Sequence, residues 1–207
     1  ECMSCDYRCP DGKHHTACGG AGAGSCNDCQ AGQFKDAQTP EAVTCFACPA
    51  GKFQSQAGKT KCAACTPGTF HNARGTAQNF SSRCSYCPNG KYQPSAGQLG
   101  CTQCSKGRYN PFRGRHAAAS CMACHHGKFG DAIGMTSCKL CGVGQFQEGE
   151  GQSTCHSCAP GQYNPYFGRG SKGFCYFCPC GKWSMSQANV CVECAAGRYR
   201  HGKGGSR

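Results

Sequence analysis

Apolar residues are sparse along this chain and recur at fixed positions. From Cys26-Cys29 onward, every pair of cysteines separated by two residues is followed by a glycine three positions later and an aromatic residue five positions later. The glycine predicts a tight turn with positive φ, and the aromatic ring is expected to pack over the nearby disulfide as most of each unit's core. The ten aromatic residues are Phe34, Phe53, Phe70, Tyr92, Tyr109, Phe129, Phe146, Tyr163, Trp183 and Tyr199.

This regularity predicts a small disulfide-rich protein of about ten short tandem units. We expect short two-stranded β ribbons and turns, almost no helix, and contacts between neighbouring units only, which together give an elongated rod. The repeats are predicted over residues 26–194. Residues 1–25 form an atypical cysteine-rich unit, in which His14 takes the aromatic position after Cys9, and residues 195–207 form a basic, glycine-rich tail.

Composition supports a scaffold without a conventional core. Leu, Ile and Val together number seven, and with 11 Phe they make up less than a tenth of the 207 residues. Cysteine, with 25 residues, exceeds the ~8–10% that marks a disulfide scaffold. A disulfide that closes a loop of ~15 residues stabilises the fold by ~3 kcal/mol, so a series of them can hold such a chain.

Cysteine pairs can also bind zinc, carry redox chemistry or hold iron–sulfur clusters, but the spacing in this sequence fits these three roles less well than structural disulfides. Zinc ribbons have 15–20 residues between cysteine pairs, but most gaps here are 12–13 or 16 and the pairs run on without grouping into fours. Redox pairs begin a helix in a βαβ unit, which nothing here resembles. Iron–sulfur ligands are more tightly clustered. Structural disulfides are therefore the favoured interpretation, and zinc binding is the third function hypothesis.

Charge points to an acidic partner. The formal net charge is +12, and the stretch from residue 42 to residue 130 contains eleven Lys and Arg but no Asp or Glu. The residue between the glycine and the aromatic is basic in six units, which predicts a stripe that contacts acidic glycan or an acidic protein face. Alternatively, these side chains are solvated and partly stacked on neighbouring rings. They are Lys52, Lys91, Arg108, Lys128, Lys182 and Arg198.

The sequence contains no arrangement typical of catalysis, so we expect no enzyme activity, no cofactor and no bound metal. Adjacent histidines at His14-His15 and His125-His126 have metal-binding chemistry but are expected to be solvated loop residues.

The sequence also predicts one modification site, because Asn79 begins a glycosylation sequon. No apolar run is long enough to span a membrane, and no motif predicts nucleic-acid binding.

The stretch Cys48-Pro49-Ala50-Gly51-Lys52-Phe53 to Cys62, with Cys65-Thr66-Pro67-Gly68-Thr69-Phe70, resembles the ephrin-receptor-like cysteine-rich repeat. It is also similar to the smallest module of tumour-necrosis-factor-receptor cysteine-rich domains. The resemblance extends from about Cys26 to Tyr199. It implies that the second cysteine of each pair bonds the first cysteine of the next; the rival is an interlaced scheme, such as Cys45 with Cys62. The implied pairs are Cys29–Cys45, Cys48–Cys62, Cys65–Cys84, Cys87–Cys101, Cys104–Cys121, Cys124–Cys138, Cys141–Cys155, Cys158–Cys175 and Cys178–Cys191.

The two ends depart from this pattern. We expect Cys180 to bond Cys194. At the start we expect disulfides between Cys5 and Cys18 and between Cys9 and Cys26. Cys2 is then left over, so it is expected to bond a preceding module or another chain, and the sequence is expected to be a segment of something longer or part of an assembly.

These features favour an extracellular or cell-surface protein that is structural rather than enzymatic. The leading hypothesis is a disulfide-stapled rod that spaces or assembles with partner chains in a filament, coat or matrix. The alternative is the ligand-binding or stalk region of a cell-surface receptor. The sequence does not identify the partner, because such repeats occur in proteins of many functions.

Overall fold

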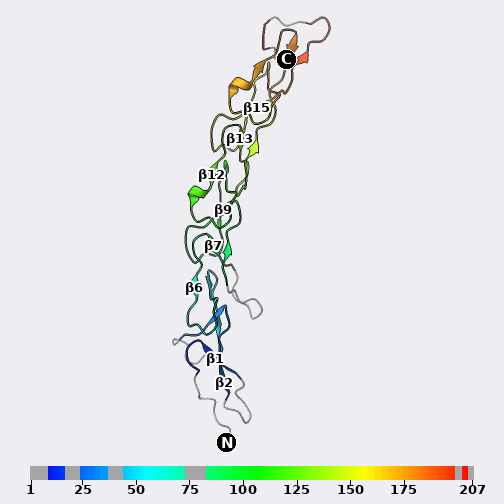
Figure 1. The fold of residues 1–207 in the computed structure, drawn as a ribbon. Helices are drawn as coiled ribbons and strands as arrows, with labels where there is room; N and C mark the ends of the chain where they lie inside the picture. The colour runs from blue at the N-terminus through cyan, green and yellow to red at the C-terminus, as the bar shows by residue number, and fades with distance from the viewer. Residues whose placement is uncertain (1–8, 17–23, 37–43, 73–82, 199–201, 205–207) are drawn as a thin grey trace. The chain divides into compact units, whose positions relative to one another are not determined.

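The structure is a computed structural model that describes residues 9–16, 24–36, 44–72, 83–198 and 202–204. Its strands form ten separate two-stranded ribbons, drawn in Figure 1 as short arrows between irregular loops. Nine of the ribbons have strands of two residues, and two three-residue 3-10 helices, η1 (Ala118–Ser120) and η2 (Lys172–Phe174), complete the described elements. The ribbons are β1 (Lys13–Thr16) with β2 (Ser25–Asp28), β3 (Gln33–Phe34) with β4 (Phe46–Ala47), β5 (Lys52–Phe53) with β6 (Ala63–Ala64), β7 (Thr69–Phe70) with β8 (Ser85–Tyr86), β9 (Lys91–Tyr92) with β10 (Thr102–Gln103), β11 (Arg108–Tyr109) with β12 (Met122–Ala123), β13 (Lys128–Phe129) with β14 (Lys139–Leu140), β15 (Gln145–Phe146) with β16 (His156–Ser157), β17 (Gln162–Tyr163) with β18 (Tyr176–Phe177), and β19 (Lys182–Trp183) with β20 (Val192–Glu193).

Each ribbon follows directly from the repeated sequence. In β13–β14, the aromatic residue Phe129 lies opposite Lys139, and Lys128 lies opposite Leu140. The turn before β13 places Gly127 at φ +73°, a conformation that side chains with a Cβ seldom adopt. The amide of Cys141 donates to the carbonyl of Gly127 at 2.9 Å and extends the ribbon. The predicted fold class of tandem disulfide-bonded ribbons, with almost no helix, is confirmed for the described residues.

Ten disulfides close the described repeats. They comprise the nine pairs implied by the family resemblance, together with Cys9–Cys26. The interlaced alternative is absent from the described residues, because Cys45 bonds Cys29 and Cys62 bonds Cys48. The expected bond between Cys180 and Cys194 is not formed, since both are free cysteines. Predictions for Cys2, Cys5 and Cys18 lie outside the described residues.

Backbone hydrogen bonds join each repeat to the next. The amide of Gly127 donates to the carbonyl of Gln147 at 2.9 Å, and the amide of Gln147 donates to Arg169 at 3.0 Å. The amide of Gly151 donates to Cys124 at 2.8 Å. The same three bonds recur through most of the described chain. Backbone groups of these irregular loops thus find partners in the neighbouring repeat rather than in a wider sheet.

Contacts also reach beyond the neighbouring repeat, which corrects our expectation of nearest-neighbour contacts only. A Cβ built on Gly127 would lie 2.1 Å from the carbonyl oxygen of Gly168, although a complete repeat, beginning at Cys141, separates the two. The same relationship joins Gly51 to Gly97 at 2.1 Å. The lack of side chains at both glycines allows two backbones to touch across the repeat between them.

The core consists mainly of disulfides, so the prediction that the aromatic residues form it is wrong. Of the aromatics at the repeated position, only Phe146 is buried among the described residues, at 7% exposed, whereas Cys29, Cys65 and Cys141 are 0% exposed. The cause is the thinness of the fold. A ribbon of two strands offers a ring one neighbouring strand and leaves its other side open, whereas most of the disulfide-bonded cysteines that begin the repeats are fully buried.

Contacts divide the chain into two compact units. Unit 1 comprises residues 1–88, 92–102 and 113–118, and unit 2 comprises residues 89–91, 103–112 and 119–207. The predicted boundaries at residues 25 and 194 stay predictions.

Candidate functional site

The position immediately after each aromatic residue, which the repeat pattern did not reveal, is polar in all but one of the described repeats, and nearly all of these positions are buried. In unit 2 the carbonyl of this residue accepts from the turn glycine of the preceding repeat, as Asn164 accepts from Gly144 at 2.7 Å. Asn110 and Asn164 are both 0% exposed. This position therefore lies at the junction between repeats. The residues that occupy it are Lys35, Gln54, His71, Gln93, Asn110, Gly130, Gln147, Asn164 and Ser184.

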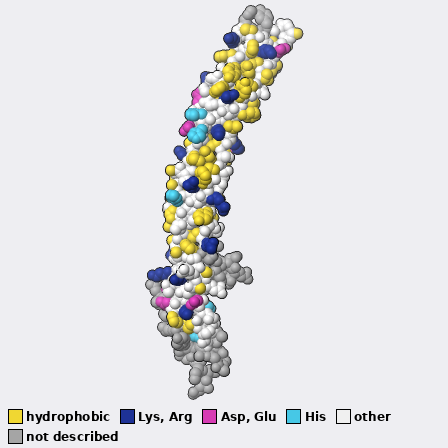
Figure 2. Space-filling model, in the orientation of Figure 1, with side chains coloured by type: hydrophobic (Ala, Val, Ile, Leu, Met, Phe, Trp, Pro, Cys, Tyr) yellow, Lys and Arg dark blue, Asp and Glu magenta, His cyan; other side chains and the backbone are white. Residues whose placement is uncertain are grey.

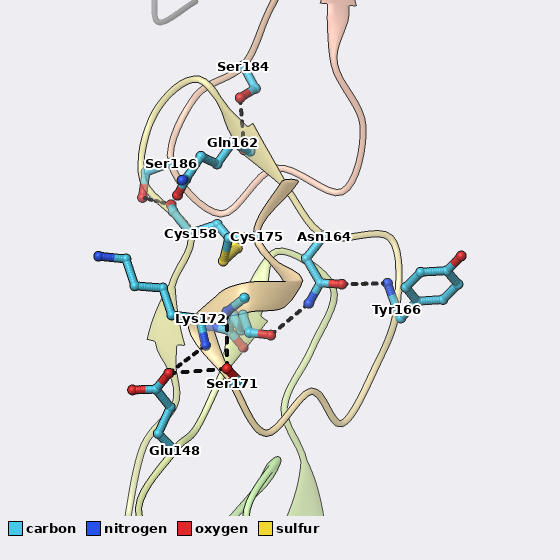
Figure 3. Close-up of a disulfide and its surroundings, with 12 residues drawn as sticks. Glu148, Cys158, Gln162, Asn164, Tyr166, Ser171, Lys172, Cys175, Ser184 and Ser186 are labelled. Carbon is cyan, nitrogen blue, oxygen red and sulfur yellow. Dashed lines mark hydrogen bonds between the residues drawn. A yellow bond between two sulfur atoms is a disulfide. The ribbon is translucent and has the colours of Figure 1, made fainter. Parts of the chain in front are cut away.

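In two of the long repeats, asparagine at this position fixes the junction with its side chain. Figure 3 shows Asn164 beside the disulfide of Cys158 and Cys175. Its Nδ2 donates to the carbonyl of Gln145 at 2.9 Å, and its Oδ1 accepts from the amide of Tyr166 at 3.0 Å. Asn110 makes the equivalent bonds to Lys91 and Phe112 at 3.0 Å each. One side chain thus sets its own loop and binds the preceding repeat.

In the short repeats, glutamine at this position spans its own loop instead. Nε2 of Gln147 donates to the carbonyl of Thr154 at 2.6 Å, and its Oε1 accepts from the amide of Gly149 at 2.8 Å. Gln93 does the same with Gly100 and Ser95. These buried polar groups are therefore engaged in holding backbone rather than exposed for chemistry.

The six predicted basic contact residues differ in what they do. Nη1 of Arg108 donates to the carbonyl of Cys121 at 2.9 Å, and Lys182 lies 3.3 Å from Glu193 across its ribbon. Lys91 is half-buried. Lys52, Lys128 and Arg198 are exposed and form no ion pair with the described residues. Contact with an acidic partner stays a prediction for all six, and these last three are the most accessible.

Lys52 lines the one cavity described for unit 1. This cavity has a volume of about 510 Å³ and is open to solvent. Three chain segments meet at it, because the amide of Gly12 donates to Lys35 at 2.9 Å and that of Lys35 donates to Lys59 at 3.3 Å. Two carboxylates, two lysines and one aromatic ring therefore line the same cavity. The lining residues are Asp11, Phe34, Asp36, Pro49, Lys52, Thr60, Lys61 and Cys62.

The adjacent histidines lie in two different settings. Nδ1 of His14 is 3.4 Å from Sγ of Cys45, near Cys29, but those two sulfur atoms are bonded to each other and are not thiolate ligands. Nδ1 of His125 lies 2.9 Å from Glu150, and His126 bonds the carbonyl of Glu148. Both members of this second pair are exposed, as the sequence predicted.

Unit 2 exposes large apolar side chains, and Figure 2 shows them interspersed with Lys and Arg. Phe167 is 66% exposed and Leu140 is 54% exposed. Beside them, the guanidinium of Arg169 lies between two rings, 4.4 Å from the centroid of Tyr166 and 4.5 Å from that of Phe174. We call Tyr166, Arg169 and Phe174 the arginine stack. The repeated cysteine, glycine and aromatic positions did not predict this arrangement.

The predicted glycosylation site, the last repeated aromatic residue and the last predicted disulfide do not appear in the structure as expected. Asn79 and Tyr199 lie outside the described residues. Cys180 is exposed and Cys194 is half-buried, both as free thiols. The two helices of the described chain have three residues each, and neither could cross a membrane.

Comparison with known proteins identifies two copies of one repeat family. The family described as "Tyrosine-protein kinase ephrin type A/B receptor-like" matches residues 38–79 and 75–119, about two fifths of the chain. The ephrin-receptor-like resemblance is therefore confirmed for these residues. No curated protein matches the chain. Together with a disulfide framework typical of oxidising compartments, this match indicates an extracellular or cell-surface protein of a non-catalytic kind.

Proposed function

We propose that this chain is a structural protein of the extracellular space, a disulfide-stapled repeat segment that spaces or assembles with partner chains in a filament, coat or matrix. The observation that carries the proposal is the use of buried polar groups. Side chains such as Asn110, Asn164 and Gln147 are occupied in fixing one repeat to the next. Such an arrangement supports mechanical continuity and places the variable side chains on the surface.

Surface charge supports an acidic partner. Lys52, Lys128 and Arg198 are exposed and unpaired among the described residues, and the stretch from residue 42 to residue 130 carries no acidic residue. Excess positive charge attracts an acidic protein face or an acidic glycan over a distance of about one Debye length, ~8 Å at physiological ionic strength. Partner binding should therefore weaken with salt, and an affinity independent of ionic strength would count against this contact.

The test is fractionation of the cells that make the protein. We expect the chain in the cell-surface or extracellular insoluble fraction, released by a reducing agent together with denaturant. Recovery as a soluble cytosolic protein with two dozen free thiols would overturn the proposal and would favour the zinc-binding hypothesis.

A second candidate is the ligand-binding or stalk region of a cell-surface receptor. The match of residues 38–119 to an ephrin-receptor-like family supports it, as do the exposed apolar side chains of unit 2. A receptor segment would be a stable monomer that binds one specific protein, whereas an assembling protein would associate with itself or with structural partners. The mass of the full chain in solution separates the two.

A further inference from the structure

The arginine stack holds a guanidinium whose hydrogen-bonding capacity is unused. Arginine has five N–H donors, and buried donors normally have acceptors. Nε of Arg169 is buried without an acceptor, and within the described residues no hydrogen bond or ion pair reaches this guanidinium. The ring centroids of Tyr166 and Phe174 lie 4.4 Å and 4.5 Å from the central carbon of this guanidinium, so both rings restrict its movement.

A planar guanidinium held in this way suits a carboxylate. The two groups form paired parallel hydrogen bonds, and little freedom is lost because the arginine is already ordered. Tyr166 of the stack is 49% exposed, and Phe167, the next residue in the sequence, is 66% exposed. Leu140 adjoins this loop, since Cδ2 of Leu140 would lie 2.9 Å from a Cβ on Gly168. Aromatic residues and arginine together are the usual composition of binding hot spots in protein–protein interfaces.

The carboxylate cannot easily come from the same unit of another copy. All four acidic residues of unit 2 have partners: Asp131 with Lys139 at 2.8 Å, Glu193 with Lys182, and Glu150 with His125. The fourth, Glu148, accepts from the amide of Lys172 at 2.7 Å, as Figure 3 shows.

The first 41 residues of the chain have the complementary charge. They contain six acidic and three basic residues, a net charge of −3, whereas the remaining residues carry +15. Asp11 is exposed there and has no ion pair among the described residues. It lines the 510 Å³ cavity together with Phe34 and Asp36, so a carboxylate lies beside an apolar wall. Lys52 and Lys61 line the same cavity.

We propose that the surface of Tyr166, Phe167 and Arg169 binds the acidic first repeats of a second copy of this chain, at the cavity of Asp11 and Phe34. The interface is head-to-tail, because each copy supplies a different surface, and such contacts propagate into open filaments unless they close into a ring. The inference rests on the proposed assembly function and specifies its partner.

The experiment measures association of the full chain by sedimentation velocity. We expect association that weakens between about 0.05 and about 0.5 M salt. Arg169→Gln and Phe167→Ser should each weaken it by about tenfold or more. Phe167 is exposed and is not part of the arginine stack, so Phe167→Ser should weaken association without disturbing the position of Arg169. Arg113→Gln removes the same charge from an exposed arginine in the equivalent loop, and it should leave association within about twofold of the unmodified chain.

A mixing experiment tests the head-to-tail geometry. Chains with Arg169→Gln keep only the acidic surface, and chains with Asp11→Asn keep only the basic one. Each variant alone should be monomeric, and a mixture of the two should form a dimer that grows no further. A monomeric unmodified chain, association unaffected by these changes, or variants that polymerise alone would each overturn the interface.

The experiments distinguish a wrong interface from a wrong proposed function. A chain that is monomeric in solution, yet recovered from the extracellular insoluble fraction, would overturn this interface and retain the structural function. Binding of the unmodified monomer to sulfated polysaccharide, lost in Arg169→Gln, would assign the arginine stack to a glycan and equally overturn the proposal.

Discussion

The carbonyl oxygen of Gly97 occupies the place where a side chain on Gly51 would begin. A Cβ on Gly51 would lie only 2.1 Å from this oxygen, closer than real Cβ contacts allow, and the φ of Gly51 is +81°. The two glycines belong to repeats separated by a complete repeat. Their contact therefore helps to fix how three consecutive repeats stack.

Replacement of Gly51 by alanine should destabilise the chain more than replacement of Gly97. Both residues have positive φ, which costs alanine about 1–2 kcal/mol. Only Gly51 adds a backbone clash, since a Cβ on Gly97 would meet Ala64 Cβ at an ordinary 3.7 Å. We expect a lower unfolding midpoint in denaturant and faster proteolysis for Gly51→Ala. Equal effects of the two variants would show that the close approach contributes nothing.

Asn164→Ala should loosen the junction between two repeats in unit 2. The change leaves the carbonyl of Gln145 and the amide of Tyr166 without partners, and each unsatisfied buried group costs about 1–3 kcal/mol. Hydrogen exchange at the Tyr166 amide should accelerate. Asn164→Ser is the matched control, because the hydroxyl of Ser184 already makes the equivalent bond to the carbonyl of Gln162 at 2.9 Å. Serine should restore part of the loss, and no difference from alanine would contradict this role.

The repeat could be predicted from sequence because it depends on residue identity at short, fixed spacing. Gly127 and Phe129 lie three and five positions after Cys124, so the turn, the ribbon and its register can all be predicted from neighbouring residues. The buried position after the aromatic was missed because its residue varies from repeat to repeat, as between Asn164 and Gln147. The repeated Asn-Pro after Tyr109 and Tyr163 was the available signal.

Two kinds of feature could not be predicted from the sequence. These are contacts between residues far apart along the chain and the extent to which each side chain is buried. The approach of Gly168 to Gly127 crosses a whole repeat, so the local spacing of cysteines does not reveal which backbones meet. The aromatic rings were expected to be buried because they are the largest apolar groups. Phe129 is instead half-exposed, since a single ribbon has no second layer to cover it.

Disulfide mapping of the unreduced protein should link Cys45 to Cys29 and not to Cys62. Alkylation under denaturing conditions should modify Cys180 and Cys194, the free cysteines of the described residues. Reduction should unfold the chain, since each closed loop of ~15 residues contributes ~3 kcal/mol. A peptide joining Cys45 to Cys62 would contradict the pairing. So would zinc release accompanied by free thiols at these positions.

Stability should depend on pH through Glu150. The hydrogen bond from His125, 2.9 Å away, and the positive charge of His125 lower the pKa of Glu150, and His126 adds a smaller effect. Because the folded state lowers this pKa, the stabilisation is present above the ordinary pKa of the carboxyl and is lost as pH falls through the lowered value. NMR titration of the Glu150 carboxyl should show its pKa rising towards the ordinary value in His125→Gln. Lys139→Gln is the matched control: it should raise the pKa of Asp131, which Lys139 lowers by a 2.8 Å hydrogen bond, and leave Glu150 unchanged. A Glu150 pKa that is the same with and without His125 would refute the pairing.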